Sequence, residues 1–203
     1  YWLDTPSGPR FVARQIAAYA FENGLNIRIG RIEGSIYGEA HLSDIRLQDD
    51  KGSFASIPHA KLDWHPLDYF YGKLSIDALI AKQAYINRLP ELRVIPDRGE
   101  PFFPDLDIRI DRLQFDRIVF DKSIAGREHI LNLQAKAHIV DARARVDATA
   151  QTIEGDRLVA HLDAIPDKDR LGMALRLDGP AGGLTSGLLG LNAPVKLRLD
   201  GQG

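Results

Sequence analysis

Strict alternation of apolar and polar residues is the feature that most limits how this chain can fold. In LNIRI, Leu25, Ile27 and Ile29 lie on one side of an extended chain, with Asn26 and Arg28 on the other. The same period of two recurs in roughly a dozen segments, up to the C-terminal VKLRLDGQG. A strand with this pattern has one dry face and one wet face. We therefore expect a mainly β protein, built as an elongated, curled antiparallel or mixed sheet.

Glycine recurs every fourth residue in GRIEGSIYG, at Gly30, Gly34 and Gly38. This spacing is a packing motif of membrane helices, but no window of the chain offers the roughly 20 apolar residues of a membrane span. The apolar parity instead changes at Gly30, from odd positions before it to Ile32 and Ile36 after it. Glycine is the usual residue at a β-bulge, so the stretch predicts two short strands separated by a kink.

The dry face is long, and its residues become smaller toward the C-terminus. No Phe, Tyr or Trp follows Phe120, so Leu, Ile, Val and Ala remain to form it. A sandwich would interlock bulky side chains from two sheets, whereas small aliphatic residues favour a flattened β-helix or a curled sheet that leaves a groove. In GKLSIDALI, the alternation predicts that Leu74, Ile76, Ala78 and Ile80 share this face.

We expect the groove to be lined by dry-face residues from successive strands. The predicted lining residues are Ile27, Ile29, Leu62, Trp64, Leu74, Ile76, Leu106, Ile108, Ile110, Leu131, Leu133, Val146, Leu175, Leu177, Leu197 and Leu199. The wet face carries charges of both signs, for example Asp107, Arg109 and Asp111. Such mixed charges favour a solvated face with ion pairs between strands.

Two helical segments interrupt the strand pattern. Residues 1–24 carry Val12 and Ile16 at helical spacing, which predicts an amphipathic helix. Residues 184–191 are rich in leucine, which predicts a short helix or an apolar loop. We therefore divide the chain into an N-terminal helix at 1–24 and a sheet with a groove at 25–203.

Composition and motifs give no sign of an enzyme. The 203 residues include no cysteine and six histidines, and the net charge is −2. The missing cysteines exclude disulfides, thiolate metal sites and cysteine nucleophiles, and they fit the bacterial periplasm among other compartments. The histidines lack the H-E-x-x-H spacing of zinc proteases, and Ser186 lies outside any G-x-S-x-G sequence. The near-neutral charge gives no case for nucleic acid. We therefore expect no catalytic residues, no metal and no cofactor.

Apolar surface is what the pattern does provide. A continuous aliphatic groove suits acyl chains or an added strand of another polypeptide, because exposed apolar area costs about 25 cal/mol per Å². The alternation is compatible with both uses, and also with a structural solenoid whose interior is filled.

The order of several segments resembles the TamB family, the inner-membrane subunits of the translocation and assembly modules of Gram-negative bacteria. The resemblance is carried by TPSG before the predicted helix, IRIGRIEGSIYG, SDIRLQDDKG, KLDWHPLDYFYGKLSI and PAGGLTSGLLGLNAPVKLRLDGQG. Residues 25–90 carry its most specific part, whereas residues 90–170 are supported mainly by alternation.

This resemblance implies a periplasmic protein that is anchored in the inner membrane by a helix preceding residue 1. It implies a β-taco, an open groove whose sheet continues beyond residue 203, and it groups the chain with AsmA-like and bridge-like lipid transfer proteins. The implied function is phospholipid transport between the inner and outer membranes, with the outer-membrane barrel TamA as a partner through a further C-terminal domain. The alternative is a chaperone-like scaffold that pairs strands with outer-membrane proteins during their insertion or secretion.

Overall fold

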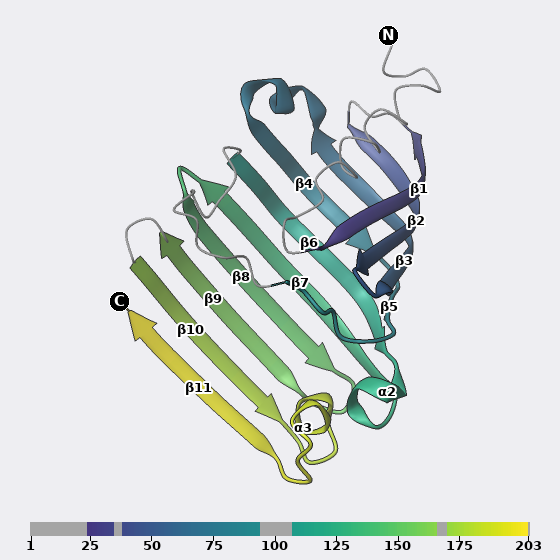
Figure 1. Cartoon of the computed structure of the whole chain (residues 1–203). Helices are drawn as coiled ribbons and strands as arrows, with labels where there is room; N and C mark the ends of the chain where they lie inside the picture. Colours follow the sequence, from purple (N-terminus) through teal and green to yellow (C-terminus); the bar gives the residue numbers. More distant parts are fainter. Residues whose placement is uncertain (1–23, 35–37, 94–106, 166–169, 203) are drawn as a thin grey trace.

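The computed structural model describes residues 24–34, 38–93, 107–165 and 170–202 (Figure 1). Eleven strands in this part of the chain form one sheet. They are β1 (Asn26–Gly34), β2 (Glu39–Asp49), β3 (Gly52–His65), β4 (Lys73–Ala81), β5 (Ala84–Ile86), β6 (Asp107–Phe120), β7 (His129–Val140), β8 (Arg143–Thr152), β9 (Arg157–Ile165), β10 (Arg170–Gly179) and β11 (Val195–Gln202). The described residues also form three short helical segments, η1 (Pro66–Tyr71), α2 (Lys122–Ala125) and α3 (Leu184–Leu188).

The mainly β prediction is confirmed, as is a short helix in the leucine-rich segment. Three predictions fall outside the described residues in whole or in part. They are the N-terminal helix, of which residues 1–23 are not described, the lining residue Leu106, and the place of Ile36 in the strand expected after Gly30.

The strand order explains why the sheet is mixed. β1 to β4 follow one another and pair antiparallel, and so do β6 to β11. Between these two blocks, β4 pairs parallel with β6. The short β5 also pairs parallel with β6, and it pairs antiparallel with β3. β4 and β5 therefore behave as one interrupted strand between β3 and β6.

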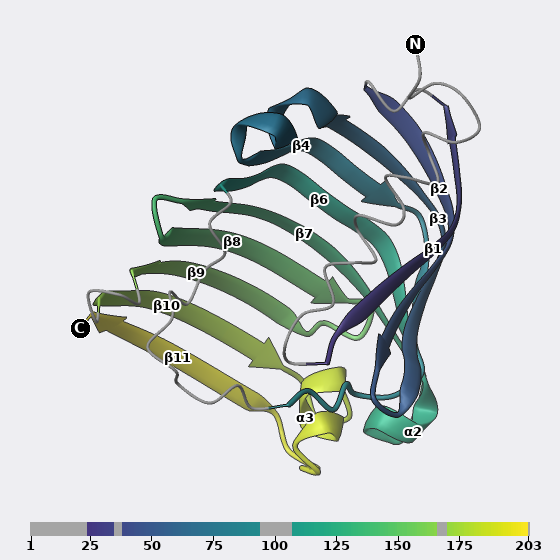
Figure 2. The same ribbon diagram turned by 45° about the horizontal axis from the view of Figure 1, so that its top comes forward.

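The sheet is strongly curved. Figures 1 and 2 show β1 to β3 at a steep angle to β7 to β11, so one side of the sheet is concave. Bulges increase the local twist and bend of strands, and the register shifts between β2 and β3, between β3 and β4, and between β6 and β7. At one end of the strands, α2 and α3 lie side by side in both views.

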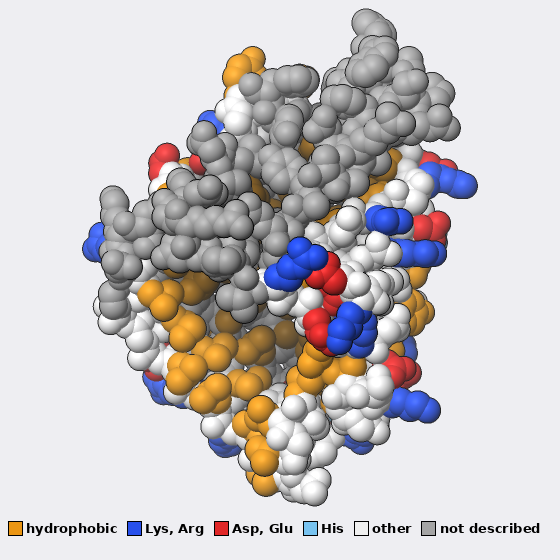
Figure 3. Space-filling model, viewed as in Figure 1, with side chains coloured by type: hydrophobic (Ala, Val, Ile, Leu, Met, Phe, Trp, Pro, Cys, Tyr) orange, Lys and Arg blue, Asp and Glu red, His pale blue; other side chains and the backbone are white. Residues whose placement is uncertain are grey.

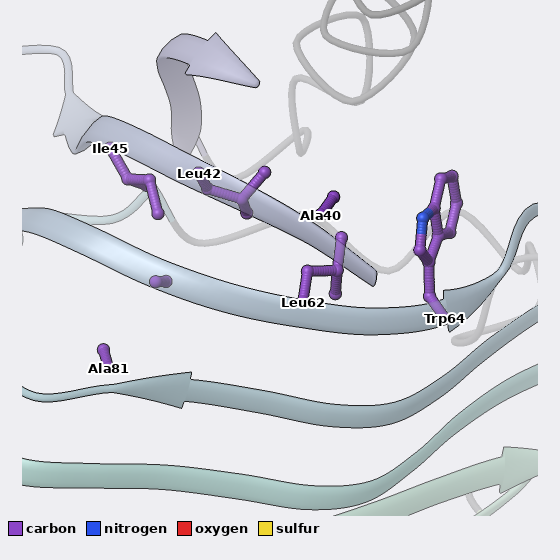
Figure 4. Packing of buried hydrophobic residues seen from close by; sticks show 7 residues of the cluster. Ala40, Leu42, Ile45, Leu62, Trp64 and Ala81 are labelled. Carbon is purple, nitrogen blue, oxygen red and sulfur yellow. The ribbon is translucent and has the colours of Figure 1, made fainter. Parts of the chain in front are cut away.

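The core of the N-terminal strands is one cluster of buried apolar residues. We call it the core cluster, and it consists of Ala40, Leu42, Ile45, Ala60, Leu62, Trp64 and Ala81. Figure 4 shows the side chains of Leu42, Leu62 and Trp64 standing on the same side of β2 and β3. Partly buried residues of β1, β4 and β6 pack against the cluster, including Ile27, Ile29, Leu74, Ile76, Leu79 and Phe115.

The predicted change of parity at Gly30 is present, but β1 remains one strand, Asn26–Gly34. Ile29 before the glycine and Ile32 after it both pack against the core cluster. The register of β1 with β2 is the same on both sides of Gly30, which lies opposite Asp44. Asp44 has a left-handed backbone, with φ of 54°. The alternation of inward and outward residues therefore shifts by one residue in both strands, at Gly30 in β1 and at Asp44 in β2. β1 does not break into two short strands.

The alternation in β4 is also broken, so the prediction for Ala78 and Ile80 is wrong. After Ile76, β4 has one extra residue where its register with β3 shifts. Leu79 and Ala81 therefore pack in or against the core cluster, and Ala78 and Ile80 take the opposite side. Residues 78–81 are all apolar, at odd and even positions alike. The alternation alone therefore does not show which of them face the core.

A buried carboxylate holds α3 at the end of the sheet. Asp156, in the turn between β8 and β9, is 4% exposed. It accepts hydrogen bonds from the backbone N–H groups of Leu184 and Thr185 at 3.0 and 2.9 Å, and from the hydroxyl of Thr152 at 2.7 Å. Burial by itself would raise the pKa of Asp156, but these hydrogen bonds lower it below its usual value. The first turn of α3 is thus capped by a side chain from another element.

Candidate functional site

Strand register gathers the predicted lining residues on one side of the sheet. Residues directly opposite each other in neighbouring strands share a face, as Ile76 and Ile110 do across β4 and β6. Residues that lie opposite one another in the pairs from β6 to β11 extend this face across the rest of the sheet. We call this side the apolar face, and it carries Ile27, Ile29, Leu62, Trp64, Leu74, Ile76, Ile108, Ile110, Leu131, Leu133, Val146, Leu175, Leu177, Leu197 and Leu199.

The middle of the apolar face is made of small residues. Ala135, Ala148 and Ala160 lie opposite one another on β7, β8 and β9, and we call them the alanine row. Leu113 on β6 and Leu175 on β10 continue the row at its two ends. Alanine side chains are short, so the surface is lower here than over the flanking leucines. Figure 3 shows hydrophobic side chains gathered around a hollow over the C-terminal strands.

Exposure changes along the apolar face. Leu62 and Trp64 belong to the core cluster and are 7% and 8% exposed. Leu171 and Met173 on β10 are 48% and 36% exposed, although β10 has a neighbour on each side. The face is therefore packed over β2 and β3 and open to solvent over β10.

Ion pairs cover the opposite, outer face. Asp147 on β8 lies 2.6 Å from Nδ1 of His161 on β9. On β6, Asp111 accepts hydrogen bonds from Arg109, and one of its oxygens lies 2.9 Å from Nε2 of His138 on β7. The hydrogen bonds from Arg109 and His138 lower the pKa of Asp111 to about 2. The two faces thus differ sharply, with charge on one and none in the central rows of the other.

A further group of ion pairs fixes the segment that follows β5. Arg88 donates two hydrogen bonds to Asp49, at 2.6 and 2.5 Å, and the N–H of Glu91 donates a third at 2.8 Å. The hydrogen bonds from Arg88 hold the pKa of Asp49 well below its usual range. Lys51 pairs with Glu91 at 2.7 Å. The segment is therefore tied to the turn between β2 and β3.

Two kinds of candidate site, a metal centre and a serine nucleophile, can be checked in the part of the chain that the structure describes. Among the described residues, no three His, Asp or Glu side chains are grouped to hold a metal ion. Ser186 is fully buried, and its hydroxyl donates to the carbonyl oxygen of Gly183 at 3.0 Å, so it stabilises α3. None of the helices in this part of the chain is long and apolar enough to cross a membrane.

Sequence reasoning missed a buried histidine beside the apolar face. Parity places most histidines on the wet face, but His129 is 1% exposed, and its Nδ1 lies 3.2 Å from the carboxylate of Glu154. One signal was available, because His129 has the parity of Leu131 and Leu133 in HILNLQAKAHIV. Its contact with Glu154 depends on the turn between β8 and β9, which no local pattern predicts.

Comparison with known proteins gives no relative for this chain. No protein-family model, no curated protein and no solved structure matches it.

Proposed function

We propose that the apolar face binds the acyl chains of phospholipids and lets them move across the strands. The observation that carries this proposal is that the apolar face is continuous across the strands. Among the described residues, the central rows of the face run from β4 to β11 without a charged side chain, for example through Leu79, Leu113, Ala135, Ala148, Ala160, Leu175 and Leu199. An exposed apolar surface of this kind is typical of a binding surface.

The energetics of acyl chains suit such a surface. Each CH₂ group removed from water contributes about 0.8 kcal/mol, so even a partly covered tail gains several kcal/mol. Movement requires many similar, shallow sites, because a single deep pocket would hold the lipid in place. Leu, Ile, Val and Ala repeated on successive strands provide similar sites.

In this proposal the curved sheet is the open groove of a TamB-like bridge, a β-taco that follows an N-terminal amphipathic helix. The protein lies in the periplasm, held by an inner-membrane anchor, and phospholipids pass along it toward the outer membrane. TamA would be reached through a further C-terminal domain. The resemblance of residues 25–90 and the curvature of the apolar sheet support this assignment.

Strand pairing with outer-membrane proteins is the alternative function. It would use the backbone edges of the sheet, and the side chains of the apolar face would then form only a core. The exposed Leu171 and Met173 of the interior strand β10 favour lipid binding, because a filled core would bury them.

Two adjacent residues of β8 give a matched test. Ala148→Asp places a carboxylate on the apolar face, whereas Thr149→Asp places one on the exposed outer face. We expect Ala148→Asp to lower binding of a fluorescent phosphatidylethanolamine by about tenfold or more, because an unpaired charge against an acyl chain is costly. Thr149→Asp should bind like the wild type.

Urea unfolding of both variants shows whether each one is folded. Binding by Ala148→Asp at the wild-type level, in a folded protein, would exclude the hollow as a path for acyl chains.

A further inference from the structure

One buried donor on the apolar face has no acceptor. Trp64 is 8% exposed, and its indole Nε1 is buried without a hydrogen-bond partner among the described residues. Figure 4 shows the indole on the same side of β3 as Leu62, with its nitrogen on the edge toward Ala40. A buried donor left unpaired costs about 1–3 kcal/mol, and a buried Trp usually has a partner for its N–H. The donor therefore points to an acceptor that these residues do not supply.

Trp64 begins a row that runs along the apolar face to the hollow. It lies opposite Ile76 on β4, and the row continues through Ile110, Ala137 and Val146. Four strand spacings of about 4.8 Å separate its ends, which gives a path of about 19 Å. All of these residues are apolar, and Val146 lies two residues from the alanine row on β8. The path is comparable in length to an extended acyl chain.

Polar groups lie on the opposite, outer face of β3, behind Trp64. Nε2 of the next residue, His65, lies 2.8 Å from a carboxylate oxygen of Asp77 on β4. Lys61 on β3 pairs with Glu39 on β2 at 2.6 Å. The sheet itself therefore separates these charged pairs from the indole of Trp64.

We propose that the Nε1–H of Trp64 donates a hydrogen bond to an ester carbonyl oxygen of a bound phospholipid whose acyl chain lies along this row. The inference rests on the proposed function, to which it adds a position and a chemical preference. The ester carbonyl is the first acceptor next to an acyl chain. In this proposal the lipid displaces the packing over Trp64, so the carbonyl reaches the buried donor while the tail stays on apolar residues. An ether-linked lipid has no such carbonyl.

The test compares two phosphatidylcholines with the same chains, one diester and one diether. We expect the wild type to bind the diester about threefold to tenfold more tightly, which is the effect of one hydrogen bond. Replacing Trp64 by β-(3-benzothienyl)alanine keeps the shape of the ring and removes the N–H, and it should abolish the preference. Trp64→Phe, which also removes the donor, is the second variant.

Fluorescence locates the lipid independently of these variants. In Trp2→Phe, Trp64 is the sole tryptophan. Phospholipids brominated beside the carbonyl should quench its emission more than those brominated at the chain end, because the ester lies at the indole.

Three results would overturn the inference in distinguishable ways. Equal binding of diester and diether lipids by the wild type would remove the role of Trp64 and leave lipid binding intact. Stronger quenching from the chain end would also remove it, because the lipid would then lie in the opposite direction. Binding of neither lipid would remove the proposed function together with the inference.

Discussion

Histidine–carboxylate pairs on the outer face make single residues sensitive to pH. Nε2 of His65 lies 2.8 Å from a carboxylate oxygen of Asp77. This hydrogen bond, together with the charge of Asp77, raises the pKa of His65. Protonation of His65 therefore stabilises the fold. The stabilisation is complete below the unfolded-state pKa of 6.5, and it is lost as pH rises through the higher folded-state value.

His65→Gln should therefore destabilise the protein in mild acid and have little effect in base. We expect a loss of up to about 1 kcal/mol at roughly pH 5.5, since the pair is exposed, and almost none at roughly pH 8.5. Urea unfolding of variant and wild type at both pH values measures the difference, in which the contributions of other histidines cancel. A loss of equal size at both pH values would show that the pair does not act through protonation.

At the scale of elements, α3 is positioned by contacts from two sides. Asp156 caps its first turn, and α2 lies against its other end. A Cβ on Gly187 would lie 2.5 Å from the carbonyl oxygen of Ala125 in α2. This distance is too short for a real contact, so only glycine allows the two helices to lie this close.

Gly187→Ala should separate α2 from α3. Overpacking of this kind costs about 1–3 kcal/mol, and the better helix propensity of alanine offsets part of it. We expect a lower melting temperature and faster amide exchange in α3. Gly201→Ala is the matched control, because a Cβ there would meet no atom within 4 Å, and it should change stability by less than about 0.5 kcal/mol. Equal stability of the two variants would contradict the close contact.

Local alternation predicts strands and their faces only while a strand is uninterrupted. Leu131 and Leu133 were placed correctly, because β7 pairs with β8 without a register shift and period two then decides the side of every residue. Ala78 was placed wrongly, because one extra residue in β4 changes the parity. The parallel pairing of β4 with β6 could not be predicted either, since it depends on which strands meet and not on their own patterns.

In the candidate site, too, some features follow from alternation within one strand and others depend on how strands pair. Trp64 and Leu175 could be assigned to the dry face from parity alone. The alignment of Ala135 with Ala148 and Ala160 depends on register between strands, so the position of the hollow could not be predicted. Whether the indole nitrogen of Trp64 has a hydrogen-bond partner depends on residues from several strands that pack around it. A pattern within one strand cannot predict this.

At the scale of the whole molecule, the sheet combines a charged outer face with an apolar face that is packed at one end and open at the other. The core cluster stabilises β2 to β4, while Leu171 and Met173 stay exposed on β10. The central claim is that acyl chains lie on the open part of this face.

Photocrosslinking at two adjacent residues of β10 tests that claim most directly. A photoreactive phenylalanine analogue at Leu175 would face the hollow, and one at Arg176 would face outward. In cells that make the protein, we expect labelled phospholipid to be captured at Leu175 and not at Arg176. Capture of polypeptide at Leu175 would contradict lipid binding and favour strand pairing, and no adduct at either position would contradict transport along this face.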